Sequence, residues 1–220
     1  MNQLPTLVIF CKRPLPGQGK QRIAATMGKA AAFEIATALL KCALEDAEVW
    51  PGNVVLSPAS VGDKLWAESL LQREHRVVPQ CEGNLGVKLS FIDQDLRQQG
   101  DSSLLFIGTD APEHTVSHYK ELINLFSEAD MLFSPAADGG VTAMGCNQPW
   151  PELSGLPWST PQLGTELVAS CQSAGFQVAF SSACYDVDTA ADLERLKVSL
   201  KNDTRPARQQ LLQRIESLLD

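Results

Sequence analysis

Four cationic side chains gather in a short stretch that follows the first apolar run of the chain. Residues 9–24 read IFCKRPLPGQGKQRIA, and the four cations fall within eleven residues: Lys12, Arg13, Lys20 and Arg22. Pro16, Gly17 and Gly19 lie between them, and the two glycines allow the backbone to bend close to a ligand and expose its N–H groups. Because the whole chain is acidic, this local positive charge predicts a loop that holds phosphate. A solvated surface turn is the alternative, since Pro-x-Pro-Gly suffices for one.

The loop differs from the two most common phosphate-binding motifs. A Walker A motif has glycine where this chain has Pro14, and a hydroxyl residue where it has Gln21. The dinucleotide fingerprint needs a third glycine after Gly17 and Gly19, and Arg22 stands there instead. The sequence therefore predicts a phosphate loop of another type, in which cationic side chains act together with glycine N–H groups.

An aspartate follows a strongly apolar run in LLFIGTDAP, residues 104–112. The run predicts a buried strand, and Asp110 stands just past its end. Ligands of open α/β sheets bind at the carboxyl ends of the strands, and hard cations prefer oxygen ligands. We therefore expect Asp110 to hold Mg²⁺, or Mn²⁺, against phosphate oxygens. Capping of the next helix is the alternative, for which Thr115 and Ser117 are better placed.

The segment SPAADGGVTAMG, residues 134–145, repeats this arrangement with Asp138, Gly139 and Gly140 after an apolar run. Asp-Gly is a common hairpin signal, so a plain turn is one interpretation. The paired glycines would also permit a ligand such as a sugar ring to approach closely. The residues alone favour neither interpretation.

Two further aspartates, Asp186 and Asp188, lie in CYDVDTAADL after the last apolar run. Either carboxylate could supply a second ligand to a metal ion. Asp188 or Thr189 could instead cap the helix that is predicted to begin near Ala190.

Two other segments offer ligand contacts beside predicted helix starts. Gly83, Asn84 and Gly86 precede one helix, where Asn84 could read a base edge or cap the helix, and propensity favours the cap. Trp158 and Ser159 lie beside another helix, where the indole could stack on a ligand or belong to the core.

The histidines and cysteines receive no catalytic role from the sequence. The three histidines show no pairing typical of metal ligands or of a base with its nucleophile: His75, His114 and His118. The six cysteines are widely scattered without a CxxC pair, which predicts reduced and mostly buried thiols.

Alternating apolar and helix-like stretches must position these residues. Strands are expected at residues 4–10, 53–58, 75–80, 103–108, 130–136, 139–146 and 176–181. Helices are expected at residues 28–47, 62–74, 85–100, 116–129, 160–175 (with Thr160 as its N-cap), 189–200 and 205–219. This alternation predicts a single α/β domain with three α/β/α layers and a mostly parallel sheet.

The domain is expected to span residues 1–200, and residues 201–220 to form a helical extension that packs on it. The last helix has an apolar stripe, which more often packs on its own domain than forms a dimer contact, so a monomer or a homodimer is expected.

The composition excludes some partners. A net charge of -8 argues against broad binding to nucleic acid or to an anionic membrane. The sequence contains no apolar run of membrane-helix length and no signal-peptide pattern, so a cytoplasmic protein is expected.

Taken in order, these motifs resemble a known family. The Pro-Gly-x-x-Lys-x-Arg loop is followed by QCEGNLG, GTDAP, ADGG, PWSTP and DVDT. This series resembles the rSAM/selenodomain-associated transferases, a family described as glycosyltransferases of the nucleotide-diphospho-sugar transferase (GT-A) type. It is also similar to the guanylyltransferases that activate 2-phospho-L-lactate. The chain departs from the family pattern at Gln21, at Asn84 and at Val141-Thr142, where threonine, aspartate and an aromatic pair are usual.

The resemblance implies roles for the candidate residues. Lys20 and Arg22 would hold nucleotide phosphates, and Gly83 to Gly86 would line the base side. Asp110 would bind Mg²⁺, and Asp188 would be the second metal contact. The acceptor would face residues of two loops: Asp138, Gly139, Gly140, Trp158 and Ser159. The loop residues Lys12, Pro16, Gly17 and Gly19 would complete the nucleotide site.

These observations predict a Mg²⁺-dependent transferase that binds a nucleotide. In the favoured version, a small anionic acceptor attacks a nucleoside triphosphate, with Lys20, Arg22 and Asp110 as the catalytic residues. Glycosyl transfer from a nucleotide sugar is the alternative. A nucleotide-binding protein without turnover is an alternative of another class.

Overall fold

The apolar runs of the sequence form one seven-stranded sheet in the computed structural model, which describes residues 4–219. The strands are β1 (Thr6–Cys11), β2 (Val54–Pro58), β3 (Arg76–Val77), β4 (Leu104–Ile107), β5 (Met131–Pro135), β6 (Val141–Cys146) and β7 (Val178–Phe180). Their order is β3-β2-β1-β4-β6-β5-β7. β6 runs antiparallel to both of its neighbours, and the other pairs are parallel. The predicted mostly parallel α/β sheet is confirmed.

Helices connect the strands. They are α1 (Gln21–Met27), α2 (Lys29–Val49), α3 (Lys64–Glu68), α4 (Leu85–Gln98), α5 (Val116–Leu125), α6 (Leu163–Ser173), α7 (Ala190–Ser199) and α8 (Pro206–Leu219). Two short 3₁₀ helices, η1 (Val61–Asp63) and η2 (Leu200–Asn202), precede α3 and follow α7. Residues 1–3 and 220, which belong to the predicted domain and extension, lie outside the described range.

The alternation of side chains along β1 shows how the layers are built. Leu7 and Ile9 point into a core shared with α2 and α5, whereas Val8 points into a core shared with α4 and α6. Successive residues of a strand face opposite sides, so a fully apolar strand is buried on both faces. Helices therefore cover both faces of the sheet, as the three-layer prediction requires.

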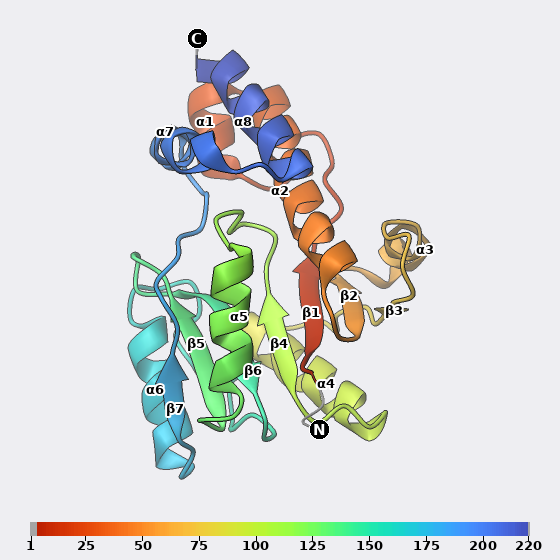
Figure 1. Ribbon diagram of the computed structural model, residues 1–220, viewed down its shortest axis with the longest axis vertical. Helices are drawn as coiled ribbons and strands as arrows, with labels where there is room; N and C mark the ends of the chain where they lie inside the picture. The colour runs from red at the N-terminus through yellow and green to blue at the C-terminus, as the bar shows by residue number, and fades with distance from the viewer. Residues whose placement is uncertain (1–3, 220) are drawn as a thin grey trace.

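A third apolar cluster lies above the carboxyl ends of the parallel strands. It joins α1, α7 and α8 to the N-terminal half of α2, and its buried members include Ile23, Ile35, Leu193, Leu211 and Ile215. Figure 1 shows these helices gathered at the top of the molecule, above the arrowheads of β1 and β4. They form the roof of the region in which a ligand of such a sheet is expected.

The strand order reverses between β1 and β4. From β1 the chain proceeds to β2 and β3 on one side, and β4 lies on the other side. The loops that leave two neighbouring strands in opposite directions open a crevice, which is the usual ligand site of such sheets. The cationic loop follows β1 and Asp110 follows β4, so both candidate groups lie at this crevice.

The prediction of a helix over residues 62–74 is wrong for its second half. Helical structure ends at Glu68, and Leu71 turns into the core, where it is 6% exposed. Arg73 then donates hydrogen bonds to three carbonyl oxygens at the end of α2, those of Ala47, Trp50 and Gly52. These contacts with a distant segment outweigh the helical preference of the local sequence.

The predicted cap at Thr160 is also wrong. The helix begins at Leu163 with Gln162 at the N-cap position, and the Thr160 hydroxyl donates to the carbonyl oxygen of Pro157 instead. Other caps are confirmed: Asn84 accepts from the N–H of Val87, and Thr189 forms a capping box.

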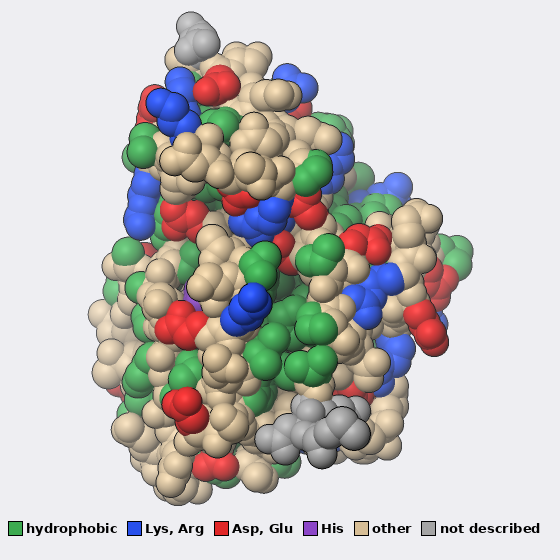
Figure 2. Space-filling model, viewed as in Figure 1, with side chains coloured by type: hydrophobic (Ala, Val, Ile, Leu, Met, Phe, Trp, Pro, Cys, Tyr) green, Lys and Arg blue, Asp and Glu red, His purple; other side chains and the backbone are tan. Residues whose placement is uncertain are grey.

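The surface shows no segregation of charge on the face drawn in Figure 2, where acidic and basic side chains are interspersed. Several of them form a row at the level where the upper helices meet the sheet. Among residues 4–219, no helix combines the length and the apolar character that a membrane crossing requires.

Candidate functional site

Lys20 ends the cationic loop in an unusual backbone conformation. Its φ of 43° and ψ of 45° lie in the left-handed region, as do the φ values of Gly17 (77°) and Gly19 (71°). Glycine adopts this region without steric cost, whereas a lysine there is strained. Such strain persists where surrounding contacts hold it, and it is common at binding sites. Here the contacts belong to the lysine side chain.

The ammonium group of Lys20 joins two aspartates that are far apart in the sequence. Its Nζ lies 2.9 Å from Asp110 Oδ1 and 3.0 Å from Asp188 Oδ1, and it donates to the carbonyl oxygen of Val187 at 2.6 Å. The Lys20 side chain is 7% exposed, while both aspartates remain about half exposed. A backbone bond from Val187 N–H to Asp110 O (2.9 Å) fixes the two acidic segments together.

The charges at this point alter two pKa values. Burial by itself would lower the pKa of Lys20, but the carboxylates of Asp110 and Asp188 outweigh it, and the pKa is raised above its ordinary value. Burial, followed by the negative charge of Asp110, raises the pKa of Asp186 to about 7. Three carboxyl groups thus share one region with a single buried ammonium group among them.

Two cavities meet at Asp186. One, of about 180 Å³, is mostly apolar and lies beside Asp110 between β4, β6 and α4, with Phe10, Leu85, Leu89 and Met144 among its lining. The other, of about 230 Å³, is polar, and its lining includes Arg22, Asp138, Asp188 and Arg195. The site therefore offers an apolar compartment and a charged compartment on the two sides of the acidic cluster.

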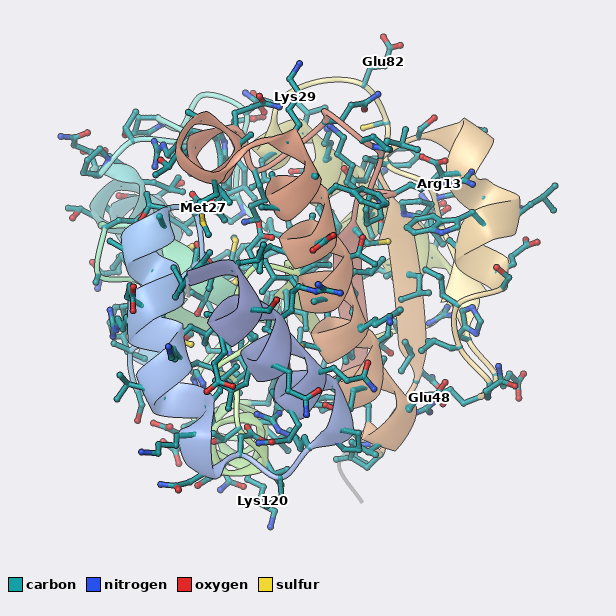
Figure 3. The ribbon with its side chains drawn as sticks, turned by 90° about the horizontal axis from the view of Figure 1, so that it is seen from above. Arg13, Met27, Lys29, Glu48, Glu82 and Lys120 are labelled. Atoms are coloured by element: carbon teal, nitrogen blue, oxygen red, sulfur yellow. The ribbon has the colours of Figure 1, made fainter. Side chains whose placement is uncertain are left out.

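The other predicted cations lie in different places. Arg22 is 76% exposed in its side chain, and its Nη1 lies 3.9 Å from Asp188 Oδ2. Arg13 instead approaches Asp63 of η1 at 3.8 Å, and Figure 3 shows it beside α3. Lys12 and Pro16 are exposed. The structure thus brings Lys20 and Arg22 to the acidic cluster and turns Arg13 toward another element.

Asp138, Gly139 and Gly140 form the turn between β5 and β6. The Asp138 carboxylate accepts from the N–H of Gly140 at 2.9 Å, as in an Asx turn. Gly139 has a φ of 88°, and a Cβ there would lie 2.1 Å from the carbonyl oxygen of Pro161. The space beside Gly139 is therefore occupied by Pro161 of the same chain and not left for a ligand. Asp138 still lines the polar cavity.

The segment Gly83–Gly86 and Trp158 meet at the start of α4. A Cβ on Gly86 would lie 2.3 Å from Leu153 O and 2.7 Å from Trp158 Nε1, and the indole N–H donates to Leu153 O at 2.8 Å. Asn84 uses its amide nitrogen on Ser154 O at 2.7 Å. Asn84 and Trp158 therefore both donate hydrogen bonds to backbone carbonyl oxygens of the protein itself. Ser159, the residue after Trp158, has a φ of 64°. Leu85, which belongs to this segment, lines the apolar cavity.

Asp186, which the sequence offered beside Asp188 as a second metal ligand, lines the polar cavity. The sequence did not select two other residues that line it, Asp192 and Arg195. Arg195 stacks its guanidinium 3.7 Å above the Tyr185 ring, which no local pattern indicates.

Replacing Asp186 by asparagine is expected to stabilise the metal-free protein at high pH. The folded-state pKa of about 7 lies above the ordinary value of 3.8, so the folded state keeps a proton that the unfolded state loses. Stability therefore falls as pH rises from about 4 to 7 and then stays constant. An asparagine side chain carries no charge, so Asp186→Asn should gain up to about 4 kcal/mol at pH 8 and little at pH 4.

Urea unfolding of both proteins at pH 4 and pH 8, in buffer containing EDTA, measures this difference. Equal changes in stability with pH for the two proteins would contradict the prediction.

The reversal of strand order at β1 and β4, with the cationic loop and Asp110 at the crevice, defines an α/β protein of the nucleotide-diphospho-sugar transferase fold. The chain belongs to the family DUF2064, described as "Uncharacterized protein conserved in bacteria", whose family model matches residues 39–160. The matched part contains Asp110 and Asp138, whereas Lys20 and Asp188 lie outside it. No curated protein matches the chain.

Solved structures share the fold at low sequence identity. A "putative nucleotide-diphospho-sugar transferase" from Desulfovibrio desulfuricans G20 has 22% identity and a TM-score of 0.86, over 99% of this chain and 97% of that chain. The 4-diphosphocytidyl-2C-methyl-D-erythritol synthase of Anaerococcus prevotii has 10% identity and a TM-score of 0.54, over 86% and 94%. A CTP complex of CMP:2-keto-3-deoxy-manno-octonic acid synthetase has 12% identity and a TM-score of 0.51, over 87% and 96%.

Proposed function

We propose that this protein is a divalent-metal-dependent transferase that moves a nucleotidyl group from a nucleoside triphosphate to a small anionic acceptor. The observation that carries the proposal is the position of Lys20 Nζ, within 3.0 Å of both Asp110 and Asp188 at the strand-order reversal. Support also comes from the fold, which a synthetase crystallised with CTP shares, and from the resemblance to rSAM/selenodomain-associated transferases and guanylyltransferases.

The donor atoms of the acidic cluster fit Mg²⁺ or Mn²⁺. Asp110 and Asp188 present carboxylate oxygens, which hard cations prefer, and a cationic group already lies between them at about 3 Å. Both carboxylates are about half exposed and can therefore be reached from solvent. When bound there, the ion would neutralise phosphate charge and hold nucleotide and acceptor together.

The side chains have separate tasks in this reaction. An oxygen of the acceptor forms a bond to the α-phosphorus of the nucleotide, and the bond from that phosphorus to the β-phosphate oxygen breaks, so pyrophosphate leaves with the electron pair. Lys20 and Arg22 stabilise the negative charge of the leaving group. The backbone N–H groups of Gly17 and Gly19, both of which have positive φ angles, would supply further donors from this loop. The apolar cavity beside Asp110 receives an uncharged part of the ligand.

Glycosyl transfer from a nucleotide sugar is the second candidate. The structural relative from D. desulfuricans is matched over 97% of its own length. Its name, "putative nucleotide-diphospho-sugar transferase", favours this second candidate. In that reaction the same cations would stabilise a nucleoside diphosphate leaving group. The two reactions differ in product, since one releases pyrophosphate and the other releases a nucleoside diphosphate.

A thermal-shift panel of nucleoside triphosphates and nucleotide sugars, with and without Mg²⁺ or Mn²⁺, tests nucleotide binding. A ligand at 100 times its Kd stabilises the folded state by about 2.7 kcal/mol, which raises the Tm of a chain of this size by about 5 °C or more. We expect such a rise for at least one nucleotide only in the presence of the metal ion. The variant Asp110→Asn should lose the metal-dependent part of the rise.

Product analysis with the nucleotide that binds then separates the candidates. Pyrophosphate release across a panel of small anionic acceptors supports the proposal, and nucleoside diphosphate release supports the glycosyl alternative. Binding without any product supports a nucleotide-binding protein without turnover. If no nucleotide changes the Tm, or if Asp110→Asn responds like the wild type, the proposal is wrong.

A further inference from the structure

Close in sequence to the acidic cluster, three side chains with metal-binding atoms converge from α5 and two loops. His114 precedes α5, His118 lies in its first turn, and Cys184 lies between β7 and α7. One ligand atom of each lies within 4.8 Å of the other two. The three residues are 1%, 8% and 5% exposed, so the cluster is closed to solvent. Its donor atoms differ in type from the carboxylate oxygens described above.

The Nδ1 atoms of the two imidazoles lie 3.1 Å apart, and the two rings are stacked, with their centroids 4.7 Å apart and their planes at 18°. Two nitrogens that each lie about 2.0–2.1 Å from one tetrahedral ion are separated by about 3.3 Å. The observed separation is therefore close to that of two ligands of one ion. A hydrogen bond between the two ring nitrogens, without any metal ion, would also give this distance.

Two hydroxyl groups contact the second ring nitrogen of His118. Its Nε2 lies 3.0 Å from Ser181 Oγ and 3.2 Å from Ser134 Oγ. Both hydroxyl groups also lie 3.2 Å from the carbonyl oxygen of Ser182, to which they can donate. With its proton on Nε2, His118 would donate to these hydroxyl oxygens and leave Nδ1 free to bind a metal ion. Metal-binding histidines show this arrangement, in which the second ring nitrogen donates to an oriented oxygen.

We propose that His114, His118 and Cys184 bind one Zn²⁺ ion. Two imidazole nitrogens and one sulfur form a borderline-soft donor set, which selects Zn²⁺ over Mg²⁺. His114 lies four residues after Asp110, and Cys184 lies two residues before Asp186. The ion would therefore join the two loops that carry the acidic cluster and act as a structural site. This site does not depend on which nucleotide or acceptor the protein uses.

Metal analysis of the full-length protein tests the proposal. The chelator-treated protein is titrated with ZnCl₂ against a chromophoric chelator, in a large excess of Mg²⁺. We expect one tightly bound equivalent and a higher Tm. Titration with CoCl₂ should give the near-ultraviolet charge-transfer band that requires a thiolate ligand. Cys184→Ala should remove both signals, whereas Cys171→Ala, which changes another fully buried cysteine, should keep them.

A milder variant covers the case in which Cys184→Ala fails to fold. Ser181→Ala removes one oxygen that orients His118 and should weaken Zn²⁺ binding about 10–100-fold. The double variant Asp110→Asn, Asp188→Asn should bind Zn²⁺ like the wild type, which separates this site from the one proposed for nucleotide transfer. Absence of tight Zn²⁺ binding in the wild type, a cobalt spectrum without the thiolate band, or loss of binding in the aspartate double variant would overturn the assignment in favour of a simple hydrogen bond between the rings.

Discussion

Turnover of the Lys20→Met variant is expected to be about 100 to 1,000 times slower than that of the wild type, the range found when one preorganised donor is removed from a transition-state site. The Lys20 side chain is 7% exposed, and its ammonium group lies at the acidic cluster, where the proposed reaction would place the phosphates of the nucleotide. Methionine keeps the length and much of the apolar stem of lysine but cannot stabilise the charge of a leaving group.

The same variant should become more dependent on Mg²⁺ for its stability. In the wild type, Lys20 Nζ lies between Asp110 and Asp188 and balances their charges. In Lys20→Met the two carboxylates face each other without that charge, and a divalent ion removes their repulsion. The rise of the Tm on addition of Mg²⁺ should therefore be larger in the variant than in the wild type.

Lys120→Met is a matched control for both measurements. Lys120 is exposed on α5, and in Figure 3 it lies at the opposite edge of the molecule from Lys29, at the start of α2. Its turnover and its response to Mg²⁺ should equal those of the wild type. If Lys20→Met retains wild-type turnover, or if its Tm responds to Mg²⁺ no more than that of the control, Lys20 does not have the role proposed for it.

Arg208→Met is expected to lower the free energy of unfolding by about 3–5 kcal/mol, the cost of breaking a buried ion pair by removing one partner. Arg208 is 0% exposed, with Nη2 at 2.5 Å from Asp46 Oδ2 and Nη1 at 3.0 Å from Glu45 Oε2. Burial raises the pKa of Asp46 despite the charge of Arg208, so this carboxylate depends on its cationic partner. Without the guanidinium group, the buried charge of Asp46 is only partly compensated by Arg205.

This network also reaches the candidate site. Arg208 Nε donates to Pro112 O at 3.2 Å, and Arg205 Nη1 donates to His114 O at 2.7 Å. Both carbonyl oxygens belong to the loop that carries Asp110. The last helix and the residue before it thus anchor this loop to α2, and the loss of Arg208 should loosen the position of Asp110 as well as destabilise the fold.

Arg214→Met, in the same helix, is the matched control. The Arg214 side chain is 48% exposed and forms a surface ion pair with Glu34 at 3.3 Å, for which a contribution below about 1 kcal/mol is expected. Urea unfolding of the two variants measures the difference. Adding Asp46→Asn to Arg208→Met should restore part of the lost stability, because it removes the unpaired charge. Equal effects of Arg208→Met and Arg214→Met would contradict the importance given to the buried network.

Local sequence patterns were sufficient to predict the class of fold and two parts of the candidate site, the cationic loop and Asp110. Apolar runs buried on both faces, such as Leu7 to Ile9, leave a parallel sheet covered by helices as the stable arrangement. Gly17 and Gly19 adopt the positive φ angles that their loop requires, and the carboxyl ends of neighbouring parallel strands bring this loop and Asp110 to one crevice. Each of these features depends on local preference or on a general rule of topology.

Which side chains meet at this crevice depends on tertiary packing. Lys20 contacts Asp188 across 168 residues of chain, and Arg73, which follows α3, donates to a carbonyl oxygen of α2. His114 and His118 meet Cys184 from another loop. Gly139 accommodates Pro161 rather than a ligand. No local pattern specifies these contacts, because each depends on how segments remote in sequence pack against one another, and burial at those contacts sets the pKa values and the charge balance of the site.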